Sequence, residues 1–376
     1  MLTEYGILTN PPKGTEPLFR WTLRSPARLH FGLVEICPDQ PHLFGGLGVT
    51  IDQPETSLVA EAHTGKFCDI SHYEIENAGS WLPRIETVLE KFNQTFVQDH
   101  ASPSTSIFSE KQAVNLRLVK PPEAHAGLGS GTQIACSMAT LLAAIRLESI
   151  HKQCIQSAFE VWEQATFPDN LSILKRLADI TGRGKRSYVG LAGHLYGGLI
   201  VDHGVHEING GERTITRIAI PDGWHALLAY SQKLATISGK QELDYFTYCA
   251  KPNLKRNQML SLIVDEIIPA IENAEMDRFG NALFEYGRLG GEIFQAVQSG
   301  LYRDSEVTAL IEAIRQFGIL ATGQTSWGPT VYAIVPTWSD ADHLQRKLQT
   351  KFGSMLITKI CRLTNQPASV SFFRSD

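Results

Sequence analysis

Residues 124–133 read Ala-His-Ala-Gly-Leu-Gly-Ser-Gly-Thr-Gln and run straight into the helix-forming residues 134–145. The glycines Gly127, Gly129 and Gly131 alternate with other residues. Glycine accepts positive φ and carries no Cβ, so backbone N–H groups in such a loop can converge on one ligand. A helix that begins there adds unpaired N–H groups and the positive end of its dipole. The stretch predicts a phosphate-binding loop, and a tight turn without a ligand is the alternative interpretation.

We expect the loop and the first turn of the helix to bind phosphate together. The hydroxyl groups of Ser130 and Thr132 add donors at the helix start. His125, just before the loop, fits either a phosphate contact or a packing role. The predicted phosphate-binding residues of this segment are Gly127, Leu128, Gly129, Ser130, Gly131, Thr132 and Gln133.

The composition is that of an ordinary globular protein with more than one core. With 376 residues the chain exceeds what one hydrophobic core usually serves, so we expect two domains. A hydrophobic content of 43% and a net charge of −5 give no basic surface for a polyanion. This balance argues against a nucleic-acid partner, while a local pocket for a small anion remains compatible with it.

Nothing in the chain resembles a targeting or membrane segment. The N-terminus has no basic segment followed by an apolar core, and no run of about 18 apolar residues occurs. The 6 cysteines are scattered without C-x-x-C pairs, which favours reduced thiols. We therefore expect a cytoplasmic protein that does not enter a membrane, with residues 1–18 forming a flexible arm.

The N-terminal half alternates between strand and helix patterns. The predicted strands are residues 19–24, 28–36, 45–51, 113–119, 198–201 and 214–220, and the predicted helices are 80–98, 131–147 and stretches within 152–180.

The C-terminal third predicts the order strand, helix, strand, strand, helix, strand, which is ferredoxin-like. Ser339 and Asp342 have capping-box spacing at the start of the second helix. The predicted strands are residues 224–230, 318–323, 330–335 and 369–373, and the long helical region is 240–316.

Three segments resemble, in order, the three motifs of the GHMP kinase superfamily. They are residues 25–35 (Ser-Pro-Ala-Arg-Leu-His-Phe-Gly-Leu-Val-Glu), the Gly127 loop, and residues 323–330 (Gly-Gln-Thr-Ser-Trp-Gly-Pro-Thr). Within that superfamily, residues 28–32 and 182–187 (Gly-Arg-Gly-Lys-Arg-Ser), with the Ser130-Gly-Thr-Gln end of the loop and the third motif, resemble the beta-ribofuranosylaminobenzene 5'-phosphate synthase family, which opens methanopterin biosynthesis.

The resemblance implies an α+β, GHMP kinase-like fold of two domains. It implies a ribosomal protein S5 domain 2-like N-terminal domain, over residues 19–210, and a ferredoxin-like C-terminal domain, over residues 211–376. It also implies a homodimer.

The resemblance further implies a glycosyl transfer. Members of the family join phosphoribosyl pyrophosphate to 4-hydroxybenzoate or 4-aminobenzoate, and carbon dioxide and pyrophosphate leave. The loop would then hold the pyrophosphate, where N–H groups stabilise the growing charge. GHMP kinases usually have a small hydroxyl residue at the position of Gly131, so this glycine weakens the kinase interpretation.

Residues 182–187 contain three cations within four positions, and these are Arg183, Lys185 and Arg186. Arginine binds phosphate and carboxylate bidentately, so the cluster suits the ribose 5-phosphate or the benzoate carboxylate. A solvated basic turn is the alternative.

Arg28 and His30 lie two residues apart in a strand and therefore share a face. Arg28 would bind a substrate anion, and His30 would orient or deprotonate the 4-hydroxyl group. From the third motif we expect Gln324, Ser326 and Trp327 to line the aromatic-acid pocket, with Trp327 stacking on the ring. The predicted catalytic residues are His30, Arg28 and Arg183.

Magnesium is the expected cofactor, because a hard cation usually neutralises a pyrophosphate leaving group. Glu35, Asp52 and Asp202 are the candidate ligands, although no spacing identifies a dedicated site. Two other interpretations stay open: an ATP-dependent small-molecule kinase of the same superfamily, and a non-catalytic ligand-binding protein.

Overall fold

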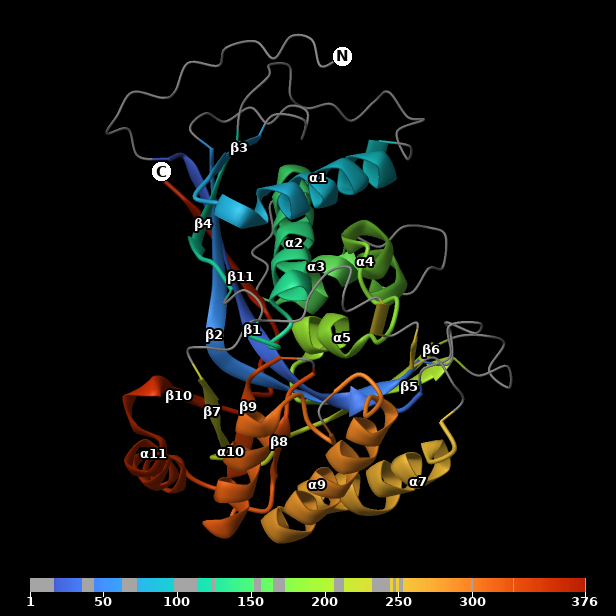
Figure 1. The fold of residues 1–376 in the computed structure, drawn as a ribbon. Helices are drawn as coiled ribbons and strands as arrows, with labels where there is room; N and C mark the ends of the chain where they lie inside the picture. The colour runs from blue at the N-terminus through green and yellow to red at the C-terminus, as the bar shows by residue number, and fades with distance from the viewer. Residues whose placement is uncertain are drawn as a thin grey trace.

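The structure, a computed structural model, describes residues 17–35, 44–62, 73–97, 114–122, 126–151, 157–164, 173–205, 213–231, 244–245, 248–249, 253–298, 300–326 and 328–375. Two sheets organise these residues, with helices packed against both (Figure 1).

The larger sheet has seven strands in a mostly antiparallel arrangement. Along the path β11-β1-β2-β4-β3 the neighbours are hydrogen-bonded, and β5 pairs with both β2 and β6. Its strands are β1 (Phe19–Leu33), β2 (Gly46–Ala62), β3 (Tyr73–Glu76), β4 (Val114–Lys120), β5 (Leu199–Val205), β6 (Arg213–Ile218) and β11 (Ser369–Arg374).

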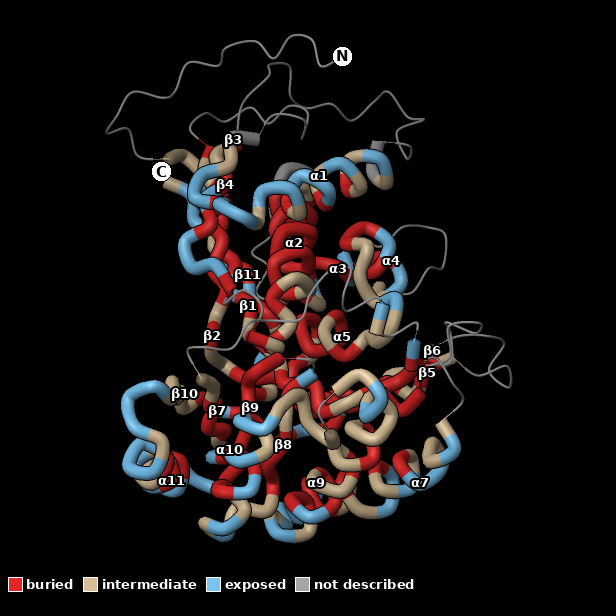
Figure 2. Tube along the Cα trace, viewed as in Figure 1, coloured by how far each residue is buried: buried red, intermediate tan, exposed pale blue. Residues whose placement is uncertain are grey.

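Five helices gather on one side of this sheet (Figure 1). They are α1 (Leu82–Val97), α2 (Ser130–His151), α3 (Ala158–Gln164), α4 (Ile173–Thr181) and α5 (Val189–Tyr196). The central helix α2 is buried along most of its length (Figure 2). Because α2 is apolar on nearly every face, packing on all sides holds its N-terminus in place at the end of the glycine loop.

The smaller sheet has the antiparallel order β10-β7-β9-β8. Numbered within this unit, the order is 4-1-3-2, as in ferredoxin-like folds. Its strands are β7 (His225–Ser231), β8 (Thr322–Gln324), β9 (Val331–Val335) and β10 (Leu356–Arg362). The helices that accompany it are α7 (Arg256–Ser261), α8 (Ile268–Glu272), α9 (Met276–Ile293), α10 (Ser305–Gln316) and α11 (Trp338–Phe352), with a π-helical segment over Leu262–Ile267.

Alternation along β9 buries this small sheet on both faces. Val331 and Ala333 face the core that α10 and α11 complete, while Tyr332 and Ile334 face a second core. That second core also contains residues of α9 and of β1 and β2, Phe31 among them. The two sheets therefore share one hydrophobic core, in which α9 lies against the lower part of β1.

The α+β, two-sheet architecture predicted from the sequence is confirmed, with three corrections in detail. The two predicted strands at 19–24 and 28–36 form one strand, β1, with an irregularity between Ser25 and Ala27. The predicted last strand of the ferredoxin-like unit pairs instead with β1 as β11, and β10 takes its place. Helix α11 is capped by Thr337, whose side chain accepts a hydrogen bond from the Asp340 N–H, and not by Ser339.

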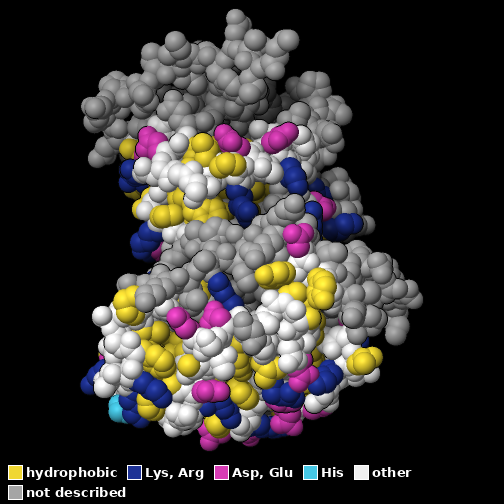
Figure 3. Space-filling model, in the orientation of Figure 1, with side chains coloured by type: hydrophobic (Ala, Val, Ile, Leu, Met, Phe, Trp, Pro, Cys, Tyr) yellow, Lys and Arg dark blue, Asp and Glu magenta, His cyan; other side chains and the backbone are white. Residues whose placement is uncertain are grey.

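The division into residues 19–210 and 211–376 stays a prediction, with both β6 and β11 belonging to the larger sheet. Among the described residues no helix is long and apolar enough to cross a membrane. Figure 3 shows basic and acidic side chains interspersed on the visible face, which accords with the modest net charge of −5.

Candidate active site

A cavity of about 470 Å³ is lined by β1, the connection between α4 and α5, α9 and β8. Small-molecule sites typically measure roughly 300–1,000 Å³. The predicted site residues that line the cavity are Arg28, His30, Thr132, Arg183, Lys185, Arg186, Gln324 and Ser326. Residues from all three motifs and from the basic cluster thus meet in one place.

The glycine loop makes the predicted turn into α2. Gly127 and Gly129 have φ values of 78° and 79°, in the left-handed region that glycine tolerates. The N–H groups of Thr132 and Gln133 both donate to the carbonyl oxygen of Gly129, at 2.8 and 3.0 Å. These bonds start α2 directly behind the loop and present the side chain of Thr132 to the cavity.

The third motif joins the other two through Thr325, which is fully buried. The Thr325 hydroxyl donates to the carbonyl oxygen of Gly127 at 3.3 Å and accepts from the His30 N–H at 3.1 Å. Next to it, the Ser326 N–H donates to the His30 carbonyl oxygen at 3.0 Å. A Cβ on Gly127 would lie 2.8 Å from the Gly328 Cα, so both loops depend on glycine to pack this closely.

Arginine side chains lie over the loop and the start of α2. Arg28 Nη1 donates to the Gly127 carbonyl oxygen at 3.2 Å, and Arg183 Nε donates to the Thr132 hydroxyl at 3.1 Å. Among the described residues that line the cavity, none is aspartate or glutamate. This side of the cavity therefore offers a positive potential and preorganised donors to an anionic ligand. We call the side formed by Arg28, Thr132 and residues 183–186 the cationic wall.

Arg84, on α1, is a further cation that the sequence did not reveal. Its Nη1 donates to the Gly131 carbonyl oxygen at 2.9 Å, and a Cβ on Gly131 would collide with its guanidinium. Burial lowers the pKa of Arg84 from its usual range. The glycine at position 131 thus makes room for a guanidinium beside the helix start. No motif surrounds Arg84 that could have pointed to it.

His30 lies on β1 between the cationic wall and β8 and is only 8% exposed. Burial, with the charges of Arg28 and Arg186, holds the pKa of His30 well below its usual range, so the ring is neutral at pH 7. The Gly32 N–H donates to its Nδ1 at 3.3 Å, which leaves the imidazole proton on Nε2. This environment favours orienting a substrate over removing a proton from it.

The opposite side of the cavity is apolar and aromatic. It is formed by β1 and its connection to β2, by α9 and by the segment after α9, and Phe31 is its only residue that belongs to one of the three motifs. We call this set the aromatic wall: Phe31, Phe44, Phe284, Gly287, Phe294 and Tyr302. Such a surface suits a flat aromatic ring. The sequence places Phe31 in a predicted strand and in the first motif, Phe44 in no predicted element, and the other four residues only in a long helical region.

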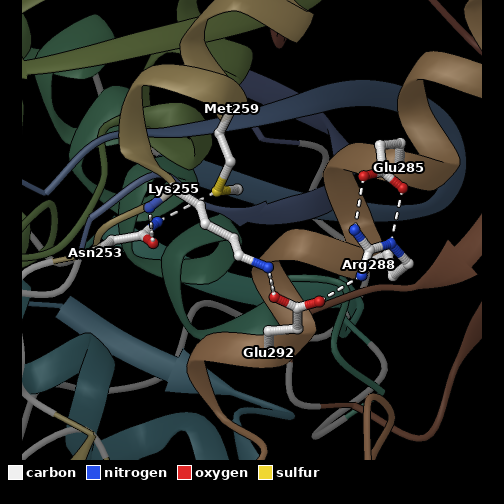
Figure 4. A network of polar contacts seen from close by, with 6 residues as sticks. All are labelled: Asn253, Lys255, Met259, Glu285, Arg288 and Glu292. Carbon is white, nitrogen blue, oxygen red and sulfur yellow. Dashed lines mark hydrogen bonds and ion pairs between the residues drawn. The ribbon is translucent and has the colours of Figure 1, made fainter.

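A network of ion pairs fixes α9 from outside the cavity (Figure 4). Arg288 donates from Nε and Nη2 to the two carboxylate oxygens of Glu285, each at 2.7 Å. Glu292 accepts from both Arg288 and Lys255, and these bonds hold the pKa of Glu292 below its usual range. Lys255 lies before α7, so the network ties two separate segments of the chain together.

Comparison with known proteins identifies relatives of the whole chain. It is 25% identical over 326 residues to a beta-ribofuranosylphenol 5'-phosphate synthase of Methanothermobacter thermautotrophicus, covering 83% of this chain and 88% of that protein. It is 27% identical over 346 residues to a synthase of the same name from Archaeoglobus fulgidus, covering 88% and 92%. Residues 267–354 match the family model for the GHMP kinase C-terminal region.

The chain is a relative of these synthases. Solved structures show the same fold: a homoserine kinase from Cytophaga hutchinsonii, with a TM-score of 0.58, 12% identity and coverage of 97% of this chain and 100% of that one. A mevalonate diphosphate decarboxylase from Staphylococcus aureus has a TM-score of 0.57 at 13% identity, covering 94% and 98%. The GHMP kinase-like fold and an enzyme of the synthase type, both expected from the sequence, are thus confirmed.

In this synthase relative the three candidate metal ligands all have protein partners away from the cavity. Asp202 accepts from Arg213 Nη1 at 2.6 Å and from two backbone N–H groups, and it is fully buried. The Glu35 carboxylate accepts from the Asn253 N–H at 2.8 Å, and the Asp52 carboxylate accepts from the Arg362 N–H at 2.8 Å. The described residues contain no group of three or more side chains suited to a metal.

Several predicted contacts take structural positions instead. Gln133 donates to the carbonyl oxygens of Ser25 and Pro54, so it joins α2 to β1 and β2. Leu128 lies in the shared core, and Ser130 is 9% exposed at the first position of α2. None of these three lines the cavity. Trp327 and His125 lie outside the described residues, and their roles stay predictions.

Proposed function

We propose that this protein transfers ribose 5-phosphate from phosphoribosyl pyrophosphate to 4-hydroxybenzoate, releasing carbon dioxide and pyrophosphate. One observation carries the proposal: a single cavity combines a cationic wall with an aromatic wall, and none of its described lining residues is acidic. A substrate with two phosphorylated ends suits the first wall, and a benzoate ring suits the second.

The names of the relatives support the hydroxy acid over 4-aminobenzoate. Their product is a ribofuranosylphenol 5'-phosphate. A phenol is what 4-hydroxybenzoate becomes when its carboxylate is replaced by ribose. The corresponding product of 4-aminobenzoate would be an aniline, so we propose 4-aminobenzoate only as a secondary acceptor.

The proposed reaction begins at the anomeric carbon of the ribose. The bond from that carbon to pyrophosphate breaks, and the pyrophosphate leaves with the electron pair. Donors from Arg28, Arg183 and Thr132 would stabilise the growing negative charge, because they are held in place before the reaction starts. The Arg84 guanidinium would add positive charge at the start of α2.

The aromatic carbon that carries the carboxylate then bonds to the anomeric carbon. Loss of carbon dioxide returns the electron pair of the broken carbon–carbon bond to the ring and restores aromaticity, so no net proton is gained or lost. A neutral His30 would orient the acid through its Nε2–H without accepting a proton from it. Of the two roles predicted for His30, orientation and deprotonation, the proposal therefore keeps orientation.

Magnesium remains part of the proposal in a restricted form. The described residues of the cavity supply cations and hydroxyl groups but no carboxylate, a donor set that fits an anion and not a hard cation. Any magnesium ion would therefore arrive bound to the pyrophosphate, and the protein would not supply a dedicated site. We also propose a homodimer in the cytoplasm that acts at the first step of methanopterin biosynthesis.

The decisive experiment supplies the purified protein with phosphoribosyl pyrophosphate and carboxyl-labelled 4-hydroxybenzoate. We expect labelled carbon dioxide and pyrophosphate in equal amounts, and a product with the mass of ribofuranosylphenol 5'-phosphate. ATP with candidate alcohols serves as the parallel assay. Formation of ADP without labelled carbon dioxide would overturn the proposal in favour of a kinase, and binding without turnover would favour a ligand-binding protein.

A further inference from the structure

Gly287 leaves an open place in the wall of the cavity. It lies on α9 between Phe284 and Phe294 and lines the cavity with both of them. A Cβ added to Gly287 would meet a single heavy atom within 4 Å, the hydroxyl of Tyr332, at 4.0 Å. Helix propensity alone would favour alanine at such a position, so the glycine gives up helix stability to keep this space free.

Tyr332 points its hydroxyl toward the same place. Its ring lies over Gly323, the cross-strand neighbour on β8, where a Cβ would come within 2.6 Å of the hydroxyl oxygen. Gly323 and Gly287 both line the cavity, so the hydroxyl stands behind a wall that has no side chain at either point.

The Tyr332 hydroxyl is a buried polar group without a hydrogen-bond partner among the described residues. Tyr332 is fully buried, and its hydroxyl makes no hydrogen bond with any described residue. Burial raises its pKa well above the usual range, so it stays protonated and able to donate. Buried hydroxyl groups are nearly always hydrogen-bonded in proteins. The neighbouring Tyr286, by contrast, donates to the Gly32 carbonyl oxygen at 3.0 Å.

We propose that the space over Gly287 is the acceptor-ring subsite, and that the Tyr332 hydroxyl is the hydrogen-bond partner of the ring's para substituent. The inference rests on the proposed function and adds the residues that select the acceptor. Phe31, whose ring centroid lies 5.0 Å from that of Tyr332, and Phe284 flank the subsite.

The two walls fix the orientation of the acid. The ring carbon that carries its carboxylate must face the anomeric carbon of the ribose, which the phosphates hold at the cationic wall. The para substituent points the opposite way across the ring, toward the aromatic wall and Tyr332. A 4-hydroxyl group can accept the Tyr332 hydrogen bond, whereas an unsubstituted benzoate cannot.

The first test fills the proposed subsite. The variant Gly287→Leu extends a side chain into the space next to Tyr332, while Asn281→Leu places the same side chain on the exposed face of α9. For Gly287→Leu we expect the KM for 4-hydroxybenzoate to rise roughly tenfold or more. The KM for phosphoribosyl pyrophosphate should stay within about twofold, and Asn281→Leu should change neither constant. Equal effects on both substrates would overturn the subsite.

The second test removes the polar contact alone. We compare Tyr332→Phe with Tyr286→Phe by measuring how strongly benzoate and 4-hydroxybenzoate compete for binding. The native protein should prefer the hydroxy acid by about tenfold, and only Tyr332→Phe should abolish that preference. A preference that survives in Tyr332→Phe would overturn the assignment, as would one lost equally in Tyr286→Phe.

Failure of this inference is distinguishable from failure of the proposed function. If the native protein releases labelled carbon dioxide but neither variant alters acceptor selection, the function stands and the subsite is wrong. If the native protein releases no labelled carbon dioxide, both the proposed function and the subsite are wrong. Thermal unfolding of each variant shows whether it is folded, and Gly287→Ala, which adds one methyl group, provides a milder version should Gly287→Leu not fold.

Discussion

The cationic wall and the aromatic wall of the cavity differ in how the chain builds them. The cationic wall takes its residues from β1, α2 and the connection between α4 and α5, and specific hydrogen bonds join the motifs around it, as when the Thr325 hydroxyl bonds to the Gly127 carbonyl oxygen and to the His30 N–H. The aromatic wall takes its residues from β1, the connection to β2, α9 and the segment after α9, and it depends on the packing of their side chains. Tight loops demand particular residues at each position, whereas a helix face demands only suitable size. One site can therefore be specified half by motifs and half by shape.

Removing Arg183 should break the cationic wall with the largest effect. Its Nε bonds to Thr132 at the start of α2, and both residues line the cavity. For Arg183→Met we expect kcat/KM for phosphoribosyl pyrophosphate to fall roughly a hundredfold to a thousandfold, as for other preorganised donors to a developing anion. Steady-state pyrophosphate release measures it. Arg117→Met removes an exposed arginine of β4 and should behave like the native protein; similar losses in both would contradict the assignment.

Arg84 tests whether the cationic wall extends beyond the motifs. The variant Arg84→Met removes the guanidinium that bonds to Gly131 and should lower kcat/KM for phosphoribosyl pyrophosphate by about tenfold. The effect should be smaller than at Arg183, because Arg84 does not line the cavity. Gly131→Ser should give a similar loss, since its side chain would displace the same guanidinium. A tenfold loss in one variant and no loss in the other would contradict the conclusion that Gly131 acts by making room for the Arg84 guanidinium.

Much of the cationic wall could be predicted because its residues are adjacent in sequence. Alternating glycines before a helix-forming run gave the loop, and two-residue spacing placed Arg28 and His30 on one strand face. Arg84 could not be found this way, because it reaches Gly131 from a helix 47 positions earlier. A contact of this kind depends on how α1 packs against α2, and no local pattern records that packing.

Apart from Phe31, which lies in the first motif, the aromatic wall escaped prediction for the same reason. Periodicity assigned residues 240–316 to helix but could not say which face of α9 borders a cavity. Gly287 reads in the sequence as a helix-weakening residue, and its purpose emerges only when Tyr332 is found beside it. The last predicted strand shows the limit again: residues 369–373 were predicted as a strand and form most of β11, but their partner is β1, more than three hundred positions away.

Acid should destabilise the fold through two sets of groups that act in different pH ranges, which gives the smallest effect. His194, on α5, is buried between Ser25 of β1 and Thr140 of α2, at 3.0 and 2.9 Å. Burial lowers its pKa to about 3, whereas the unfolded chain takes up the proton near pH 6.5. The ion pairs on α9 involve Glu285 and Glu292, whose pKa values lie below the usual 4.5.

The direction in which the free energy of unfolding changes with pH depends on whether the folded or the unfolded protein binds more protons. Between about pH 6.5 and 3 the unfolded chain carries a proton on His194 that the folded protein does not, so the free energy of unfolding falls as the pH falls. We expect a loss of about 1 kcal/mol per pH unit from this group, and His30 acts in the same direction. The α9 carboxylates favour folding above about pH 4.5 and lose that contribution as acid protonates them, so their effect begins at a lower pH than that of His194. Urea unfolding from pH 8 to 4 measures the slope, which His194→Gln should make shallower; at pH 8 the same variant reports only its lost hydrogen bonds. An identical slope in the variant would show that His194 is not the group through which acid lowers the stability of the protein.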